Sequence, residues 1–171
     1  AGASEAANNN STTAYEYGFV GDLGVKGLQV HYFKNANNDL SSGATNEVKA
    51  EGKNYGVKYN FGEITVAANR KLNQAETDLT KQATGEVGEI TETAYAAAYA
   101  VNKDLTVGLL YAKAERSGTA ITGGDQKVKA INIGYALGPV NLAAAYAQNE
   151  NHQNIAGADS ETFMVRLIGA F

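Results

Sequence analysis

The stretch Asn54–Asn69 reads NYGVKYNFGEITVAAN, and its pattern decides the fold. Apolar residues take every second position in Tyr55–Phe61 and again in Ile64–Ala68, with the pair Gly62-Glu63 between the two runs. Successive side chains of a β-strand point to opposite faces, so each run gives its strand one apolar face. A short connection that contains Gly is typical of a tight turn. The stretch therefore predicts two neighbouring strands joined by a turn.

The same alternation recurs along the whole chain and predicts nine strands. The 10 Tyr and 5 Phe of the sequence suit the half-buried surface of a sheet. Each predicted strand has roughly 9–12 residues, close to what a tilted strand needs to cross a bilayer. The apolar runs are Tyr15–Phe19, Leu28–Tyr32, Tyr55–Phe61, Ile64–Ala68, Tyr95–Val101, Leu105–Tyr111, Ile131–Leu137, Val140–Tyr146 and Phe163–Phe171.

The predicted connections alternate between short and long. The short ones have the residue types of tight turns, whereas the long ones are polar stretches. Outer-membrane barrels have this asymmetry, with short periplasmic turns and longer extracellular loops. The sequence therefore predicts an all-β fold, a transmembrane antiparallel up-and-down β-barrel. The short connections are Gly21–Gly24, Gly62-Glu63, Asn102–Asp104 and Gly138-Pro139, and the long ones are Asn35–Glu47, Asn73–Glu89, Ser117–Gln126 and Gln148–Glu161.

The two ends of the chain fall on opposite sides of this predicted barrel. The last strand would end at Phe171 on the periplasmic side, and residues 1–13 would be the remnant of an extracellular loop. Single-chain bacterial barrels have an even number of strands and both ends on one side. We therefore expect residues 1–171 to be the C-terminal part of one β-barrel domain, with further strands before Ala1. The alternative is a complete eight-stranded barrel in which Tyr15–Val20 is not a strand.

If the alternating apolar set faces lipid, the opposite parity of each strand faces the lumen. Polar side chains there imply water inside or a plug of polar side chains, because a closed barrel satisfies its own backbone hydrogen bonds. The fifth to eighth strands place many small residues on this side, such as Ala96 and Gly134, and small residues favour a wide lumen or a wall on which an inserted loop packs. The predicted lumen-facing residues include Glu16, Gln29, His31, Lys58, Lys71, Asn132 and Arg166.

The final stretch, Thr162–Phe171 (TFMVRLIGAF), resembles the last strand of bacterial porins, which alternates apolar residues and ends in Phe. Gly134–Val140 (GYALGPV), followed by Leu142–Tyr146 (LAAAY), is similar to a hairpin of general porins from Gram-negative alphaproteobacteria. The resemblance implies a barrel of about 16 strands that forms homotrimers, of which this chain would be roughly half. In that family the ending resembles a signal read by the barrel-assembly machinery. The residues that match it here are Phe163, Val165, Leu167 and Phe171.

Porins of this kind set a ladder of basic residues on the wall against an acidic loop that folds inward. That third loop would precede Ala1, so the resemblance carries over no acidic residue of the constriction. For the basic side it suggests Lys58 and Arg166, with Lys71 and Arg116 nearer the outer rim. A lumenal cation would lower the barrier to anions. The alternative is that these four residues are merely solvated charges of the wall.

Chemistry other than transport has little support in the sequence. Without Cys, neither a disulfide nor a cysteine-ligated metal site can form, and the formal net charge of −4 opposes nucleic-acid binding. His31 and His152 lack the spacing of metal ligands. The acidic residues of the long connections lack a calcium-loop motif, so we expect no metal there. No Ser-His-Asp arrangement is visible in the sequence either, so we expect no catalytic residue, no cofactor and no enzyme. The acids of the long connections are Glu76, Asp78, Glu86, Glu89, Asp159 and Glu161.

The sequence thus predicts an outer-membrane pore for the passive diffusion of small hydrophilic solutes and ions. Its expected partners are outer-membrane lipid, further copies in a homotrimer, the barrel-assembly machinery and the solutes themselves. One alternative is a small closed outer-membrane barrel with a structural or adhesive role through its extracellular loops. Another is a soluble β-sandwich in which the apolar face is a dry core.

Overall fold

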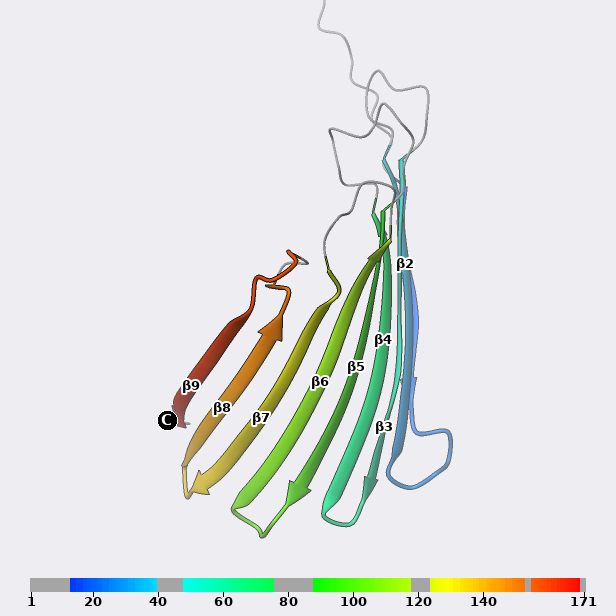
Figure 1. The fold of residues 1–171 in the computed structure, drawn as a ribbon. Coiled ribbons are helices and arrows are strands. Elements are labelled where there is room, and N and C mark those ends of the chain that lie inside the picture. The colour runs from blue at the N-terminus through cyan, green and yellow to red at the C-terminus, as the bar shows by residue number, and fades with distance from the viewer. Residues whose placement is uncertain (1–12, 40–47, 76–87, 118–123, 153–154, 170–171) are drawn as a thin grey trace, which may run out of the picture.

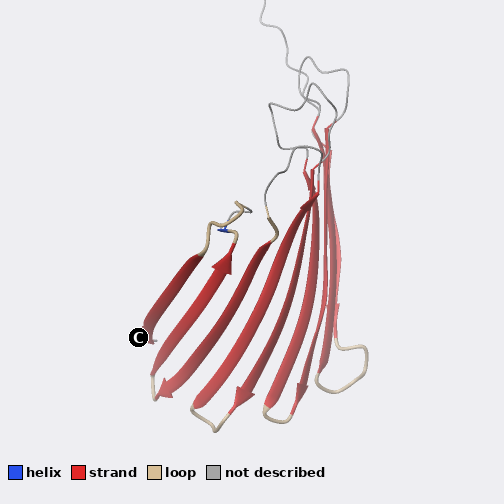
Figure 2. Cartoon of the chain, in the orientation of Figure 1, coloured by secondary structure: helices blue, strands red, loops and turns tan. Residues whose placement is uncertain are grey.

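The computed structural model describes residues 13–39, 48–75, 88–117, 124–152 and 155–169. These residues form nine antiparallel strands in one sheet, and each strand pairs with the next one along the chain. Figures 1 and 2 show this up-and-down arrangement. No helix in these ranges is both long and apolar enough to cross a membrane. The strands are β1 (Thr13–Gly21), β2 (Leu28–Asp39), β3 (Val48–Phe61), β4 (Ile64–Ala75), β5 (Gly88–Ala100), β6 (Leu105–Ser117), β7 (Gln126–Leu137), β8 (Val140–Glu150) and β9 (Ser160–Gly169).

Each of the nine predicted segments coincides with or overlaps one strand, so the prediction of an all-β, up-and-down order is confirmed. Tyr15–Val20 belongs to β1, and every residue of β1 is paired with β2. The eight-stranded alternative that leaves this segment out is therefore wrong. Thr13 is also part of β1, which shortens the predicted loop remnant, and residues 1–12 lie outside the described residues.

The strands run further into the long connections than the apolar alternation predicts. β2 continues to Asp39 and β4 continues to Ala75. Past the apolar runs, polar residues remain paired across strands, as Lys34 is with Lys53. Backbone hydrogen bonds do not depend on the type of side chain, so strand pairing continues after the hydrophobic pattern has ended.

The short connections lie together at one end of the sheet (Figure 1). Gly62 and Gly138 each begin a two-residue turn, and each has a φ of 65°. A positive φ at the first turn residue, followed by a residue such as Pro139 with its fixed negative φ, matches the type II′ hairpin turn that favours Gly. The connection between β1 and β2 is longer than predicted, because it spans residues 22–27.

The register aligns the side chains of all nine strands into two faces. Cross-strand partners lie on the same face of a sheet, and the partners of Tyr55 are Tyr32 on β2 and Arg70 on β4. Such pairings, followed from β1 to β9, place the nine apolar runs on one side, which we call the apolar face. The opposite parity forms the polar face.

The sheet has no hydrophobic core of its own among the described residues. None of their hydrophobic side chains is buried, and Phe163 and Leu167 on the apolar face are 71% and 69% exposed. The sheet bends, since Figure 1 shows β6–β9 broadside and β2–β5 nearly edge-on. It does not close, because β1 pairs only with β2 and β9 only with β8 within the described strands. Barrel closure, membrane insertion and a total of about 16 strands stay predictions.

Candidate functional site: the polar face

All eight residues predicted to line a pore lie on the polar face. Gln29 and Lys58 are direct cross-strand partners, whereas Arg166 is on β9, six strands from Lys58. At about 4.8 Å between strands, these two basic residues are roughly 30 Å apart along the sheet. The structure therefore gathers only part of the predicted set, and a role in lining a pore stays a prediction. The eight residues are Glu16, Gln29, His31, Lys58, Lys71, Arg116, Asn132 and Arg166.

The four basic residues of this face differ in their partners. Nζ of Lys71 lies 3.8 Å from Oε2 of Glu92, and both side chains are exposed enough that this pair is weak. Within the described residues, Lys58, Arg116 and Arg166 take part in no ion pair. Their charges are therefore available to attract anions from solution.

Several polar side chains lie across the polar face, over glycines of a neighbouring strand. His31 on β2 reaches over Gly56 on β3, and its Nε2 is 2.9 Å from Oδ1 of Asn69 on β4. Asn132 covers Gly108 in a similar way. A Cβ at either glycine would collide with the covering side chain. The glycines thus let polar groups rest against the sheet and keep the space above it open.

The polar face of β5–β8 is built largely from small residues, as predicted. Ala96, for example, lies opposite Ala67 on β4 and Leu110 on β6. Such residues leave room above the sheet, which a narrow barrel would instead fill with large side chains. The small residues on this part of the polar face include Ala94, Ala96, Ala98, Gly108, Ala112, Gly134, Ala136, Ala143 and Ala145.

Phe33 is a polar-face residue that the sequence interpretation missed. It directly follows the apolar run Leu28–Tyr32 but lies on the other face, where its cross-strand partners are Gly18 on β1 and Asn54 on β3. Its ring packs over Gly18, where an added Cβ would collide with ring atoms. The signal in the sequence is that Phe33 breaks the alternation of the run before it.

Toward the long connections, the apolar face ends in a belt of charged residues. Beyond Tyr32 and Tyr55, two lysines share one carboxylate, because Lys34 and Lys53 both pair with Glu51. The distance from Nζ of Lys53 to Oε1 of Glu51 is 3.7 Å. A row of tyrosines followed by charged groups is typical of a surface that passes from an apolar layer, such as the inside of a bilayer, into water.

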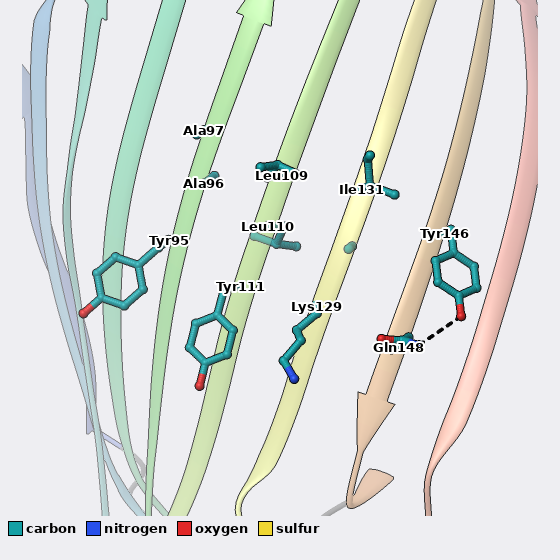
Figure 3. Close-up of a pocket in the computed structure, with 11 residues that line it drawn as sticks. Tyr95, Ala96, Ala97, Leu109, Leu110, Tyr111, Lys129, Ile131, Tyr146 and Gln148 are labelled. Atoms are coloured by element: carbon teal, nitrogen blue, oxygen red, sulfur yellow. Dashed lines mark hydrogen bonds between the residues drawn. The ribbon is translucent and has the colours of Figure 1, made fainter.

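A second part of this belt borders a groove on the apolar face (Figure 3). The groove has a volume of about 500 Å³ and lies among the rings of Tyr95, Tyr111 and Tyr146. Lys129 lies at its edge, with Nζ 2.7 Å from Oε1 of Glu150. Rings and aliphatic side chains make up most of the lining, so this groove suits hydrocarbon rather than hydrophilic solutes.

The remaining predicted residues are placed only in part. Phe163, Val165 and Leu167 alternate on the apolar face of β9, whereas Phe171 lies outside the described residues. Among the acids of the long connections, Glu76, Asp78 and Glu86 also lie outside them. In the ranges that the structure describes, no group of three or more His, Asp or Glu side chains is placed to hold a metal ion.

Comparisons with known proteins found no relative of this chain. No family model, no curated protein and no solved structure matches this chain. The resemblance to porins therefore rests on the sequence alone, in the stretches Thr162–Phe171, Gly134–Val140 and Leu142–Tyr146.

Proposed function

We propose that this chain forms part of the wall of an outer-membrane β-barrel pore in a Gram-negative bacterium, through which small hydrophilic solutes and ions diffuse passively. The apolar face would contact lipid, and the polar face would line the aqueous path. As in the porins that the sequence resembles, the complete barrel would have about 16 strands and assemble as a homotrimer.

The observation that carries this proposal is the separation of the two faces over all nine strands. The register keeps the apolar runs on one side of the sheet from β1 to β9, with no hydrophobic core among the described residues. An apolar face that extends over nine strands needs an apolar environment. The strands contain 9 to 14 residues, and a tilted transmembrane strand needs about 9–11.

The composition of the polar face supports a path for water and solutes. Amide and charged side chains line β2–β4, while β5–β8 contribute mostly Ala and Gly. An interior wall of small residues leaves volume that a narrow, filled barrel does not have. This disfavours a small closed barrel with a purely structural or adhesive role.

A soluble β-sandwich has less support than a membrane barrel. Sandwiches bury the apolar side of one sheet against a second sheet. The described strands all belong to one sheet, and exposed side chains such as Tyr95 and Leu109 have no covering layer there. A sandwich would therefore require a second layer from outside these residues.

The test is single-channel recording of the intact, detergent-extracted protein in a planar lipid bilayer. We expect discrete current steps, in groups of three if the protein is a trimer. Mass spectrometry of the same sample gives the length of the chain that conducts. A folded protein that inserts into the bilayer without conducting would contradict the pore and leave the closed barrel as the better proposal.

A further inference from the structure

Phe33 stands apart from every other aromatic residue in the described strands. All 10 Tyr of the chain have apolar-face parity, and so do Phe19, Phe61 and Phe163. Phe33 is thus the single Phe or Tyr side chain on the polar face of the described strands. An apolar ring on a surface meant for water needs a reason, and contact with a ligand is one.

The ring of Phe33 lies against neighbours on β1 and on its own strand β2. Gly18 on β1 leaves space for it, since any Cβ there would collide with Cδ1 of the ring. The imidazole of His31 lies on the same strand, with 6.0 Å between the ring centroids. Phe33 is only partly exposed. The ring is therefore a partly buried platform on the wall, packed over Gly18 and beside His31.

A hollow of about 360 Å³ lies beside this platform, within the size range of small-molecule sites. Its residues come from four adjacent strands, β1 to β4. Lys34 and Lys53 contribute main chain, because their side chains point to the apolar face. The side chains at the hollow are those of Glu16, Phe33, Asn35, Asn54, Lys71 and Asn73.

One polar atom in this group lacks a hydrogen-bond partner. Oδ1 of Asn54 is buried and accepts no hydrogen bond. Asn54 is a cross-strand partner of both Phe33 and Lys71, so it lies between the ring and the charged end of the hollow. A buried acceptor without a donor is costly, so a rotation of the Asn54 amide that turns Oδ1 toward a ligand hydroxyl in the hollow would relieve this cost.

We propose that this hollow binds a neutral saccharide, an inference that rests on the proposed pore because solute would reach the site along the lumen. The charged side chains at the hollow are the carboxylate of Glu16 and the ammonium of Lys71, and Lys71 already pairs with Glu92. The three amides at the hollow are neutral, so most of its polar groups suit a neutral ligand better than an ion. Sugar hydroxyls both donate and accept, as the amides of Asn35, Asn54 and Asn73 require. The C–H side of a sugar ring packs against the negative face of an aromatic ring.

The experiment records ion current through the intact protein in planar bilayers while maltose is added. A bound sugar obstructs the path, so the current should fall and saturate with concentration. Polyethylene glycol of similar mass should lower the current without saturation. Phe33→Leu, which keeps an apolar side chain but removes the ring, should raise the half-saturating maltose concentration about tenfold. Asn54→Ala should also raise it.

Two matched controls separate the site from general effects on the wall. Phe19→Leu removes an aromatic ring on the apolar face of the adjacent strand, and Asn141→Ala removes an amide on the polar face of β8. Both variants should keep the wild-type maltose response. If Phe33→Leu responds like wild type, or if wild-type current shows no saturation, the saccharide site is wrong while the pore stands.

Further outcomes distinguish an error in the proposed ligand class from an error in the proposed pore. A Phe33-dependent block by tetramethylammonium or inorganic phosphate, with none by maltose, would overturn the neutral saccharide. If the protein does not conduct at all, the pore is contradicted, and saturation-transfer NMR of maltose with the detergent-solubilised protein still tests the hollow. Maltose contacts that vanish in Phe33→Leu would then support the site, and their absence from wild type would overturn it.

Discussion

The apolar face and the polar face of this sheet share one backbone but pack their side chains in different ways. On the apolar face, large rings such as those of Tyr59 and Phe61 stack on one another, 5.5 Å apart between centroids, and stay exposed. On the polar face, His31 and Asn132 lie over glycines, and much of the remaining surface is alanine. The first face offers side chains to an apolar partner, and the second keeps space free.

The two faces also change differently along the strands. On the apolar face, the chemistry switches from tyrosines to charged and amide groups at the end that leads to the long connections, as beyond Tyr146, where Gln148 donates a hydrogen bond to Glu161. The polar face carries charged or amide groups along the whole length of the strands. Asn141 on β8 lies near the short turns, and Arg116 on β6 lies near the long connections. Only the apolar face has a sharp boundary, which is expected if only that face meets a bilayer.

The largest expected effect comes from a charge placed on the wrong face. Leu109 and Leu110 are neighbours on β6 with opposite orientations, since Leu109 is paired with Ile131 and Leu110 with Ala130. Leu109→Arg should destabilise the folded protein in lipid vesicles by about 2–4 kcal/mol, the cost of a cation near the middle of a bilayer. Urea-induced unfolding measures this.

Leu110→Arg is the matched control and should cost under about 1 kcal/mol, because its guanidinium would meet water. Equal losses for the two variants would mean that the two faces do not differ in their surroundings.

A smaller effect is expected where the polar face depends on glycine. Gly108→Ala forces Asn132 away and should cost about 1 kcal/mol, as overpacking does. Gly134→Ala on the same face is the control, because nothing lies within 4 Å of its added Cβ. Thermal unfolding of both variants in detergent compares them, and an equal stability would contradict the contact between Asn132 and Gly108.

Ion selectivity should distinguish lysines on the two faces. Lys58→Gln removes from the polar face a cation that has no ion-pair partner among the described residues. It should lower the anion-to-cation permeability ratio about twofold, since a charge near the ion path contributes only a fraction of a kcal/mol in water. The reversal potential in a salt gradient gives this ratio. Lys129→Gln, on the apolar face, should leave it unchanged, and a shift of equal size in both variants would argue against the assigned faces.

The smallest effect is expected from the belt of ion pairs. Glu150→Gln removes the carboxylate shared by Lys127 and Lys129. Exposed pairs of this kind contribute under about 1 kcal/mol and are weakened by salt. The difference in unfolding free energy between Glu150→Gln and wild type should therefore shrink toward zero as salt rises, and a large difference that persists at high salt would show that the belt is a buried network.

Much of the fold could be predicted because alternation reports side-chain direction. Tyr55–Phe61 fixes a strand and its apolar side without any knowledge of its neighbours. The ends of the strands could not be found this way, since Lys34 and Lys53 stay paired through their backbones after the apolar run has stopped.

The polar-face residues were predictable by parity, but their contacts were not. That Asn132 covers Gly108, or that Phe33 covers Gly18, depends on the register between strands. One sequence leaves that register open until strand pairing is known. The hollow beside Phe33 draws on four strands, so no single stretch of sequence contains its signal.

The most direct test of the central claim, that the two faces meet different solvents, is a cysteine scan of β7 from Ala130 to Tyr135. Residues 1–171 contain no Cys, so each single substitution, such as Ile131→Cys or Asn132→Cys, introduces the one thiol of this stretch. In lipid vesicles, positions 131, 133 and 135 should resist a water-soluble thiol reagent, and fluorophores attached there should be quenched by brominated lipid. Positions 130, 132 and 134 should show the reverse. Labelling without a period of two, or lipid quenching at all six positions, would contradict the account.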